Sequence, residues 1–146
     1  MKKFILIFLI LVLIAYYITL TAKKSSSVIT INNRKIIVEI ADNDKERTQG
    51  LSGRKSLSQN HGMLFIFPTK SIQRFWMKDM HFPIDIIWID GDKIVGFSEN
   101  LKPGGSNPKS IYSLPKPVDK VLEVPVGTVK ELNIKIGDTI VLSISS

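Results

Sequence analysis

Hydrophobic and polar positions divide the chain into a continuous apolar segment and a longer part in which short apolar runs alternate with polar residues. Residues 4–20 are apolar apart from Thr19 and the tyrosine hydroxyls. At ~1.5 Å per residue this segment makes a helix of about 25 Å, and continuation through residues 21–22 brings it close to the ~30 Å of a bilayer core. The pattern predicts a membrane anchor or signal segment with a short tether in residues 1–27 and a single folded domain in residues 28–146.

Charged residues around this segment predict how it is oriented. Lys2 and Lys3 precede it and favour a cytoplasmic N-terminus, although Lys23 and Lys24 follow it and oppose that bias. Residues 20–22 (Leu-Thr-Ala) are a poor match to the small-residue pattern of a signal-peptide cleavage site. We therefore expect a single-pass anchor in the cell membrane with the C-terminal domain outside the cytoplasm. The alternative is a cleaved signal peptide and a secreted domain.

From residue 28 onward the apolar positions predict short β-strands. Two alternating runs flank an Asn-Asn-Arg triplet at residues 32–34, and asparagine tolerates the positive φ of a tight hairpin turn. Short helices are expected after Asp42 or Asn43 and at 127–133 with Thr128 as N-cap, and a proline-rich loop at 101–117. The further strands are expected at 63–67, 74–78, 84–89, 93–98, 118–126 and 140–144. This is a mainly β domain, a β-sandwich or small barrel with one or two short helices.

The expected strand at residues 84–89 contains one acidic residue among large apolar side chains. A run of this kind is typical of a strand covered on both faces. Alternation places Asp85 on the same face as Ile87 and opposite to Trp88. A buried carboxylate without a partner costs several kcal/mol, so we expect a partner for Asp85. The candidates are Lys78, Arg74 and a set of backbone N–H groups.

Composition and charge exclude several kinds of chemistry. The chain has no cysteine, which excludes disulfides, thiol catalysis, Cys-ligated metals and a lipid anchor on an N-terminal cysteine. Four of the 20 Lys and Arg residues flank the apolar segment, which leaves 16 against 13 Asp and Glu in the domain. This near balance argues against nucleic acid as the main partner. His61 and His81 are isolated and no Gly-rich phosphate loop occurs, so we expect neither a metal site nor a cofactor. The oligomeric state is open.

Four residues in the central and late strands are candidates for a binding or catalytic site. Asp85 and Lys78 are either a structural ion pair or an acid/base or ligand-orienting pair in a pocket. Glu123 lies late in a strand, and two converging carboxylates would suit glycoside hydrolysis. Trp76 is either a core residue or a flat apolar surface for a sugar ring or a lipid.

Two arginines form a second candidate site. Arg47 and Arg54 bracket a Gly-Leu turn just after a short expected helix. With free helix N–H groups, two guanidinium groups could hold a phosphate or a carboxylate. The alternative is that both are ordinary solvated side chains.

Several short motifs follow one another in a fixed order along the domain. They are Glu46-Arg47-x-x-Gly50-Leu51 with Arg54, Gly62-Met63-Leu64-Phe65, Phe75-Trp76-Met77-Lys78, Pro83-Ile84-Asp85, Leu122-Glu123-Val124-Pro125-x-Gly127 and Gly137-Asp138. Their combination resembles the bacterial and archaeal family called domain of unknown function 192. The resemblance implies one β-sandwich-like domain, often behind a signal or membrane segment, and no established activity, substrate or cofactor. The chain departs from the family pattern at Ser52, where Met is usual, and at Asp79-Met80, where Asn-Thr is usual.

These observations predict a membrane-tethered, extracytoplasmic domain that binds a small or envelope-associated ligand or a protein partner. The binding pocket is expected near Trp76, Lys78, Asp85 and Glu123. One alternative is a hydrolase that uses Asp85 and Glu123, and another is a structural scaffold without a small-molecule site. A cleft in which the two carboxylates face each other would favour the hydrolase. A closed core with both carboxylates paired to basic groups would favour the scaffold.

Overall fold

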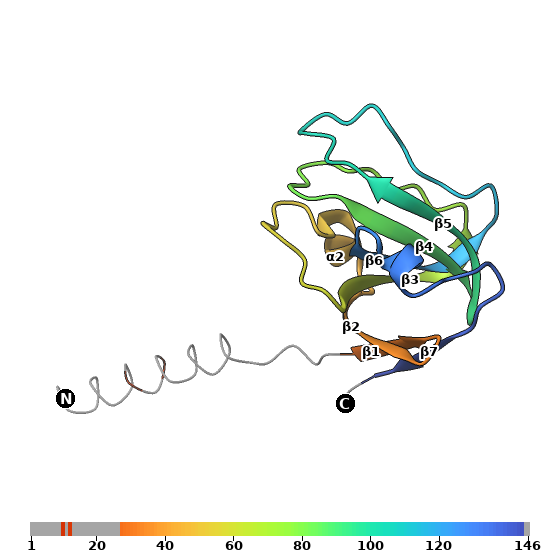
Figure 1. Ribbon diagram of the computed structural model, residues 1–146. Coiled ribbons are helices and arrows are strands. Elements are labelled where there is room, and N and C mark those ends of the chain that lie inside the picture. The colour runs from red at the N-terminus through yellow and green to blue at the C-terminus, as the bar shows by residue number, and fades with distance from the viewer. Residues whose placement is uncertain (1–9, 11, 13–26, 145–146) are drawn as a thin grey trace.

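A computed structural model of the chain describes residues 10, 12 and 27–144 (Figure 1). Apart from residues 10 and 12, the predicted membrane or signal segment therefore lies outside the described residues. Within the part of the chain that is described, no helix has the length and apolar character needed to cross a membrane. The folded domain can be followed from residue 27.

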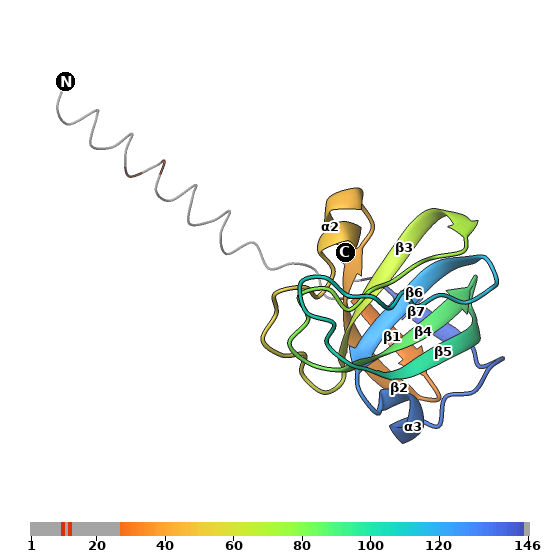
Figure 2. The ribbon, with the colours of Figure 1, turned by 90° about the horizontal axis from the view of Figure 1, so that it is seen from above.

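Seven strands form one curled sheet in the order β5-β4-β6-β3-β2-β1-β7 (Figures 1 and 2). Only β2 and β3 are parallel, and every other neighbouring pair is antiparallel. Two short helices, α2 between β2 and β3 and α3 after β6, lie at opposite ends of the sheet (Figure 2). The bounds are β1 Ser27–Ile31, β2 Arg34–Ala41, α2 Asp44–Gln49, β3 His61–Ser71, β4 Ile84–Asp90, β5 Lys93–Leu101, β6 Val118–Pro125, α3 Thr128–Glu131 and β7 Ile140–Ser143.

The curl brings the start of β5 close to the residues around the start of β7. The Ile94 N–H donates to the Asp138 carbonyl and the Gly137 N–H donates to the Ile94 carbonyl, at 2.9 and 2.8 Å. The Ile140 N–H donates to the Asp92 carbonyl at 2.9 Å. The sheet is therefore a half-barrel. The predicted mainly β class is confirmed, and the architecture is one curled sheet rather than two packed sheets.

Local turn chemistry explains the first elements. Asn32 and Asn33 have φ angles of 50° and 61°, as the predicted hairpin between β1 and β2 requires. Asn43 is the N-cap of α2, since its side-chain oxygen accepts the Glu46 N–H at 3.0 Å. Gly50 ends this helix with a φ of 49°. These sequence signals act within a few residues, which is why they could be predicted.

Two local predictions were wrong. The strand expected at 74–78 is reduced to an isolated bridge between Phe75 and Tyr112, because its partner lies in a loop and it pairs with no strand of the sheet. Thr128 is not an N-cap, since Gly127 occupies that position with a φ of 87°. The Thr128 hydroxyl instead donates to the Pro125 carbonyl at 2.6 Å.

The two faces of the sheet carry separate hydrophobic cores. Ile87 and Ile89 point into one core, which includes Val129 of α3 and is called the α3-side core below. Ile86 and Trp88 point into the other, which is called the α2-side core. The predicted burial of β4 on both faces is confirmed. The α2-side core also contains Leu51, Met63, Phe65, Met77, Met80 and Ile84.

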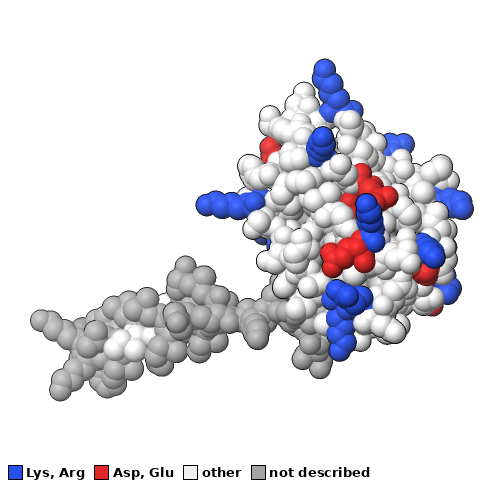
Figure 3. All heavy atoms as spheres, in the orientation of Figure 1, with Lys and Arg blue, Asp and Glu red and all other residues white. Residues whose placement is uncertain are grey.

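Charged side chains are scattered over the face of the domain that Figure 3 shows. Figure 3 shows Lys and Arg side chains dispersed over the visible face, with Asp and Glu side chains between them. The face shown has no continuous patch of one sign. The charges on this face therefore do not mark a binding site.

Candidate functional site

A pocket of about 240 Å³ opens on the α2-side core. At ~30 Å³ per molecule this volume corresponds to about eight waters, so the pocket has room for a small organic molecule. Its walls come from the end of α2 with the turn that follows, from β3, and from residues 73–76. The side chains that matter most are Phe65, Phe67, Phe75 and Trp76 on the walls, Arg47 and Arg74, Gln49 and Gln73, and Glu123.

The aromatic walls are held by features that are far apart in the sequence. The ring of Phe75 meets the ring of Phe65 edge to face with centroids 4.9 Å apart, and two backbone hydrogen bonds of 2.8 Å tie Phe75 to Tyr112. Trp76 follows directly and is 55% exposed. At Gly50 a Cβ atom would come within 3.3 Å of the Phe65 ring, so the glycine lets the turn after α2 approach this wall closely.

Glu123 is the unusual residue of the pocket. It lies in β6 opposite Met63 of β3 and Ile86 of β4, which places its side chain on the α2 side. The residue is only 5% exposed, and its Oε2 atom has no hydrogen-bond partner among the described residues. Burial raises the pKa of the carboxyl to about 8, although the positive charge of Arg54 opposes this rise. Near neutral pH the group is mostly a protonated carboxyl. Buried polar groups without a partner are uncommon in folded proteins.

Arg54 is engaged by a different carboxylate. Its guanidinium makes two hydrogen bonds to the Glu39 carboxylate of β2, one of them 2.9 Å long. These bonds raise the pKa of Arg54. Glu39 is opposite Met63 in the register, so Glu39 and Glu123 are on the same face of the sheet with one strand between them. Arg54 lines a neighbouring pocket of about 330 Å³, and not the pocket of Glu123.

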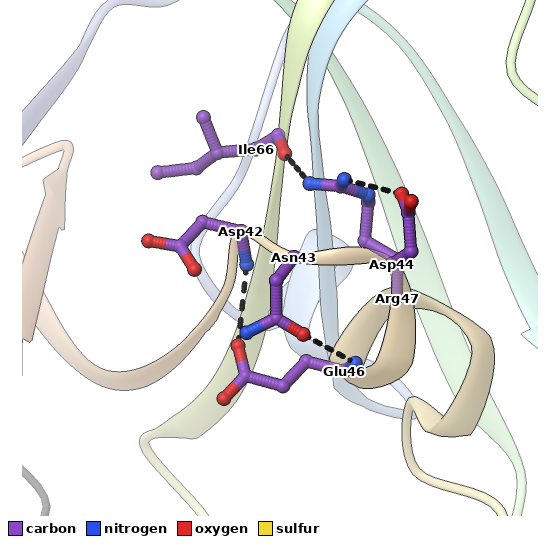
Figure 4. Close-up of polar contacts among 6 residues, drawn as sticks. All are labelled: Asp42, Asn43, Asp44, Glu46, Arg47 and Ile66. Atoms are coloured by element: carbon purple, nitrogen blue, oxygen red, sulfur yellow. Dashed lines mark hydrogen bonds and ion pairs between the residues drawn. The ribbon is translucent and has the colours of Figure 1, made fainter.

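Arg47 lines the pocket, and Figure 4 shows its polar contacts. Its guanidinium donates to the Ile66 carbonyl at 2.8 Å and to the Asp44 carboxylate at 2.7 Å. Its central carbon also lies 5.7 Å from the centre of the Phe67 ring. The predicted Arg47 and Arg54 pair is therefore not assembled, because each guanidinium has its own acidic partner and lines its own pocket.

Asp85 is fully buried in the opposite core, and its partners are backbone groups. Its two carboxylate oxygens accept the Asn100 N–H at 2.9 Å and the Val129 N–H at 3.1 Å. Of the predicted partners, the backbone N–H groups are the correct ones. No ion pair joins Asp85 to Lys78 in the described part of the chain, and the Lys78 side chain is exposed. Asp85 thus fastens the end of β5 and the start of α3 to β4.

The register of β4 and β6 contradicts the predicted pair of catalytic carboxylates. Asp85 is opposite Val124, and Ile86 is opposite Glu123. Residues directly opposite each other in an antiparallel pair point to the same face, and neighbours along a strand point to opposite faces. The two carboxylates therefore lie on opposite sides of the sheet. The hydrolase that required their convergence was a wrong prediction.

The structure brings together only some of the predicted site residues. Trp76, Arg47 and Glu123 line one pocket, Arg54 lies beside it, and Asp85 and Lys78 do not belong to it. Sequence reasoning missed the aromatic walls and the two glutamines. Phe65 and Phe67 alternate along β3, but only the register with β6 shows that they share a face with Glu123. Among the described residues, no three His, Cys, Asp or Glu side chains are grouped as metal ligands would be.

Fold and site together define a small half-barrel domain with an aromatic-walled pocket over a buried glutamate. A family model described as an uncharacterized conserved family, domain of unknown function 192, matches residues 27–142. The chain belongs to this family. The resemblance noted in the sequence is therefore confirmed.

Individual relatives agree with this assignment. The UPF0127 protein of Thermococcus kodakarensis is 30% identical over 109 residues, which is 70% of this chain and 62% of that protein, so the match spans less than two thirds of the relative. The UPF0127 protein of Pyrococcus abyssi is 33% identical over 108 residues, 70% of this chain and 83% of that protein. Neither relative's name assigns an activity.

Two crystal structures share the fold. One is a Sinorhizobium meliloti protein described as a candidate transcription regulator, with a TM-score of 0.72 and 30% identity over 80% of this chain and 92% of that chain. The other is a protein of unknown function from Novosphingobium aromaticivorans, with a TM-score of 0.69 and 26% identity over 80% of this chain and 83% of that chain. The half-barrel is therefore an architecture found by experiment in proteins similar to this one.

Proposed function

We propose that this domain binds a small organic molecule in the pocket over Glu123. The observation that carries the proposal is the unpartnered, buried carboxyl of Glu123 among the walls formed by aromatic side chains. A concave apolar site with a few polar groups and a perturbed carboxyl is the usual form of a ligand site. Trp76 supports the same conclusion, because a large aromatic ring at the mouth is left 55% exposed.

A purely structural scaffold accounts less well for Glu123. A buried carboxyl that makes no hydrogen bond contributes no pairing energy, and an apolar side chain of similar size would usually stabilise the core as well or better. Asp85 shows what a structural carboxylate looks like in this fold, with a backbone N–H on each oxygen. Glu123 lacks such partners, which favours a role toward a molecule that enters the pocket.

A role in transcription, as the description of the S. meliloti relative would suggest, has less support in this chain. The two described helices have six and four residues, whereas a recognition helix presents several turns to the major groove. The domain also has nearly balanced charge, and phosphate binding depends on a basic surface. We therefore favour a small molecule as the partner.

We further propose that the domain is tethered to the cell membrane and lies outside the cytoplasm. The proposal rests on the apolar residues 4–20 and on the two lysines that precede them. A fusion of alkaline phosphatase after Ser146 should be active and should sediment with membranes. An inactive fusion, or a soluble product that begins near Lys23, would contradict this topology.

A thermal-shift screen of the full chain in a non-ionic detergent tests the binding function. Sugars, lipids, nucleotides, amines and carboxylic acids form the panel, and a molecule that binds the native state raises the Tm. Trp76→Ala should reduce the shift, whereas Ile136→Ala, an exposed residue outside the pocket, should leave it unchanged. A panel without any shift, or shifts that Trp76→Ala does not reduce, would contradict a ligand site here.

A further inference from the structure

Building on the proposed function, we infer that the ligand is an organic cation, an amine or a quaternary ammonium compound, whose positive charge lies against Glu123 and between the aromatic walls. The inference concerns the charge and shape of the ligand, and it can fail while small-molecule binding stands.

The pairing of the charged groups in the pocket, rather than their summed charge, supports a cation, since Arg47 and Arg74 line it together with Glu123. Glu123 is the single acidic side chain among the described residues that line it, and the Oε2 atom of Glu123 has no partner. Arg47 is engaged with Asp44 and the Ile66 carbonyl, and Arg54 with Glu39. Neither arginine makes a hydrogen bond or ion pair with Glu123. A positive charge on the ligand would give the Glu123 carboxylate the ionic partner that it lacks.

The aromatic walls are also suited to a cation. The faces of aromatic rings carry partial negative charge and attract ammonium groups, tryptophan most strongly. The central guanidinium carbon of Arg47 lies 5.7 Å from the centre of the Phe67 ring, which is within the distance of a cation–π contact. Trp76 offers an exposed ring, and the remaining volume of about 240 Å³ suits a compact ammonium compound.

An organic anion would fit the site less well. Arg74 lines the pocket and its side chain is exposed, so water and salt weaken its attraction for a ligand. Glu123 is buried, and once it is ionised its effect on a ligand at equal distance is about fourfold larger if the effective dielectric constant falls from ~80 to ~20. The buried acid therefore decides the preferred charge. A neutral ligand could share a hydrogen bond with Glu123 and pack on the aromatic rings, but it would lack the attraction between a positive charge and the ring faces.

Binding of a cation should release a proton from Glu123. The charged groups around this side chain are Glu39 from β2, Arg54 and Arg47 from the α2 region, and Arg74 from the segment before Trp76. Asp85 points to the other face of the sheet. Because burial raises the pKa to about 8, most Glu123 side chains are protonated at pH 7. When the cation pairs with the carboxylate, the O–H proton passes to the buffer.

Isothermal titration calorimetry of the full chain in non-ionic detergent tests the inference with three probes of similar shape. They are choline, its uncharged carbon analogue 3,3-dimethyl-1-butanol, and the anion 3,3-dimethylbutanoate. Choline should bind at least about tenfold more tightly than the alcohol, and the anion should bind most weakly. Repeating the choline titration at pH 7 in buffers of different protonation enthalpy should show the release of close to one proton.

Variants separate the charge preference from binding itself. Glu123→Gln keeps the shape of the side chain and should reduce choline affinity to that of the alcohol and abolish proton release. Glu99→Gln makes the same change of charge on an exposed residue outside the pocket and should alter neither. Trp76→Ala should weaken both choline and the alcohol.

The outcomes distinguish this inference from the proposed function. If the alcohol or the anion binds as tightly as choline, or if choline affinity survives Glu123→Gln, the cation inference is wrong and binding stands. If no probe binds while another compound of the thermal-shift panel depends on Trp76, the cation inference is again wrong. If no compound of either set binds, the binding function fails as well.

Discussion

Asp85 and Glu123 are two buried carboxyls on neighbouring strands, but they differ in the face of the sheet on which they lie and in their hydrogen bonding. Asp85 faces the α3-side core and has a backbone N–H on each of its oxygens. Glu123 faces the α2-side core, lines a pocket and has an oxygen without a partner. The difference teaches that burial of a charge does not by itself indicate function. The presence or absence of a partner separates the structural carboxylate from the candidate binding group.

The neighbours of each residue explain the difference. On the α3 side, the end of β5 and the first turn of α3 bring backbone N–H groups that would otherwise lack partners to Asp85. On the α2 side, Glu123 lies between Met63 and Ile86 in the sheet. Aromatic side chains line the pocket on this side. The side chains of Met63 and Ile86 have no hydrogen-bond donors to offer, and the Oε2 atom of Glu123 has no partner. The following predictions test the contrast between the two sides, from the largest expected effect to the smallest.

The first prediction tests the packing of the α2-side core at Trp88, which does not line the pocket. Trp88 is 1% exposed and its ring meets the Phe75 ring at 5.7 Å, so Trp88→Ala should lower the free energy of unfolding by roughly 3–5 kcal/mol. Ile87→Ala, the matched change on the α3 side, should cost roughly 2–5 kcal/mol. Denaturant titration measures both. A loss under about 1 kcal/mol for Trp88→Ala would show that only the α3 side is a true core.

The second prediction concerns the backbone partners of Asp85. In Asp85→Asn one oxygen is replaced by an NH₂ group, which faces a backbone N–H that needs an acceptor, so we expect a loss of roughly 2–4 kcal/mol. Because Lys78 is not the partner, Lys78→Met should add to this effect within ~0.5 kcal/mol in a double-mutant cycle. A coupling energy well above that value would mean that the lysine charge stabilises Asp85 after all.

The third prediction uses the raised pKa of Glu123. Between pH 4.5 and about 8 the folded state keeps a proton that the unfolded state releases, so stability falls as the pH rises, by up to about 1.4 kcal/mol per pH unit. Glu123→Gln removes this loss and should be more stable than the wild type at pH 8 by a few kcal/mol, with a much smaller difference near pH 4.5. Unfolding titrations across this range measure the difference. A difference that stays constant across this range would show that Glu123 titrates normally.

The fourth prediction concerns the ion pair beside the pocket. Arg54 and Glu39 are partly exposed, so Arg54→Met should lower stability by at most about 1 kcal/mol. The same change removes the positive charge that opposes the rise of the Glu123 pKa, so this pKa should increase further. An NMR titration of the Glu123 carboxyl carbon measures it. A fall in the Glu123 pKa would show that Arg54 affects Glu123 by shaping the surrounding structure and not by the positive charge of Arg54.

Several features of this protein were determined by the sequence alone. The period of apolar residues predicted a mainly β domain and the burial of β4 on both faces, and Asn32 and Asn33 predicted the first hairpin. These signals are local, because side-chain direction alternates along a strand and a tight turn depends on two residues. The ordered motifs also identified the family, whose model matches residues 27–142.

The partners of the two carboxyls were decided only by the tertiary structure. Asp85 and Glu123 each interrupt an apolar run, so their local sequences look alike. Their faces depend on the register between β4 and β6, and a shift of one residue in that register would have put both carboxyls on the same side. The pocket likewise needs Gly50, Phe65 and Trp76 to meet from three distant segments. Such contacts depend on long-range pairing of the chain, which the local pattern of residues does not encode.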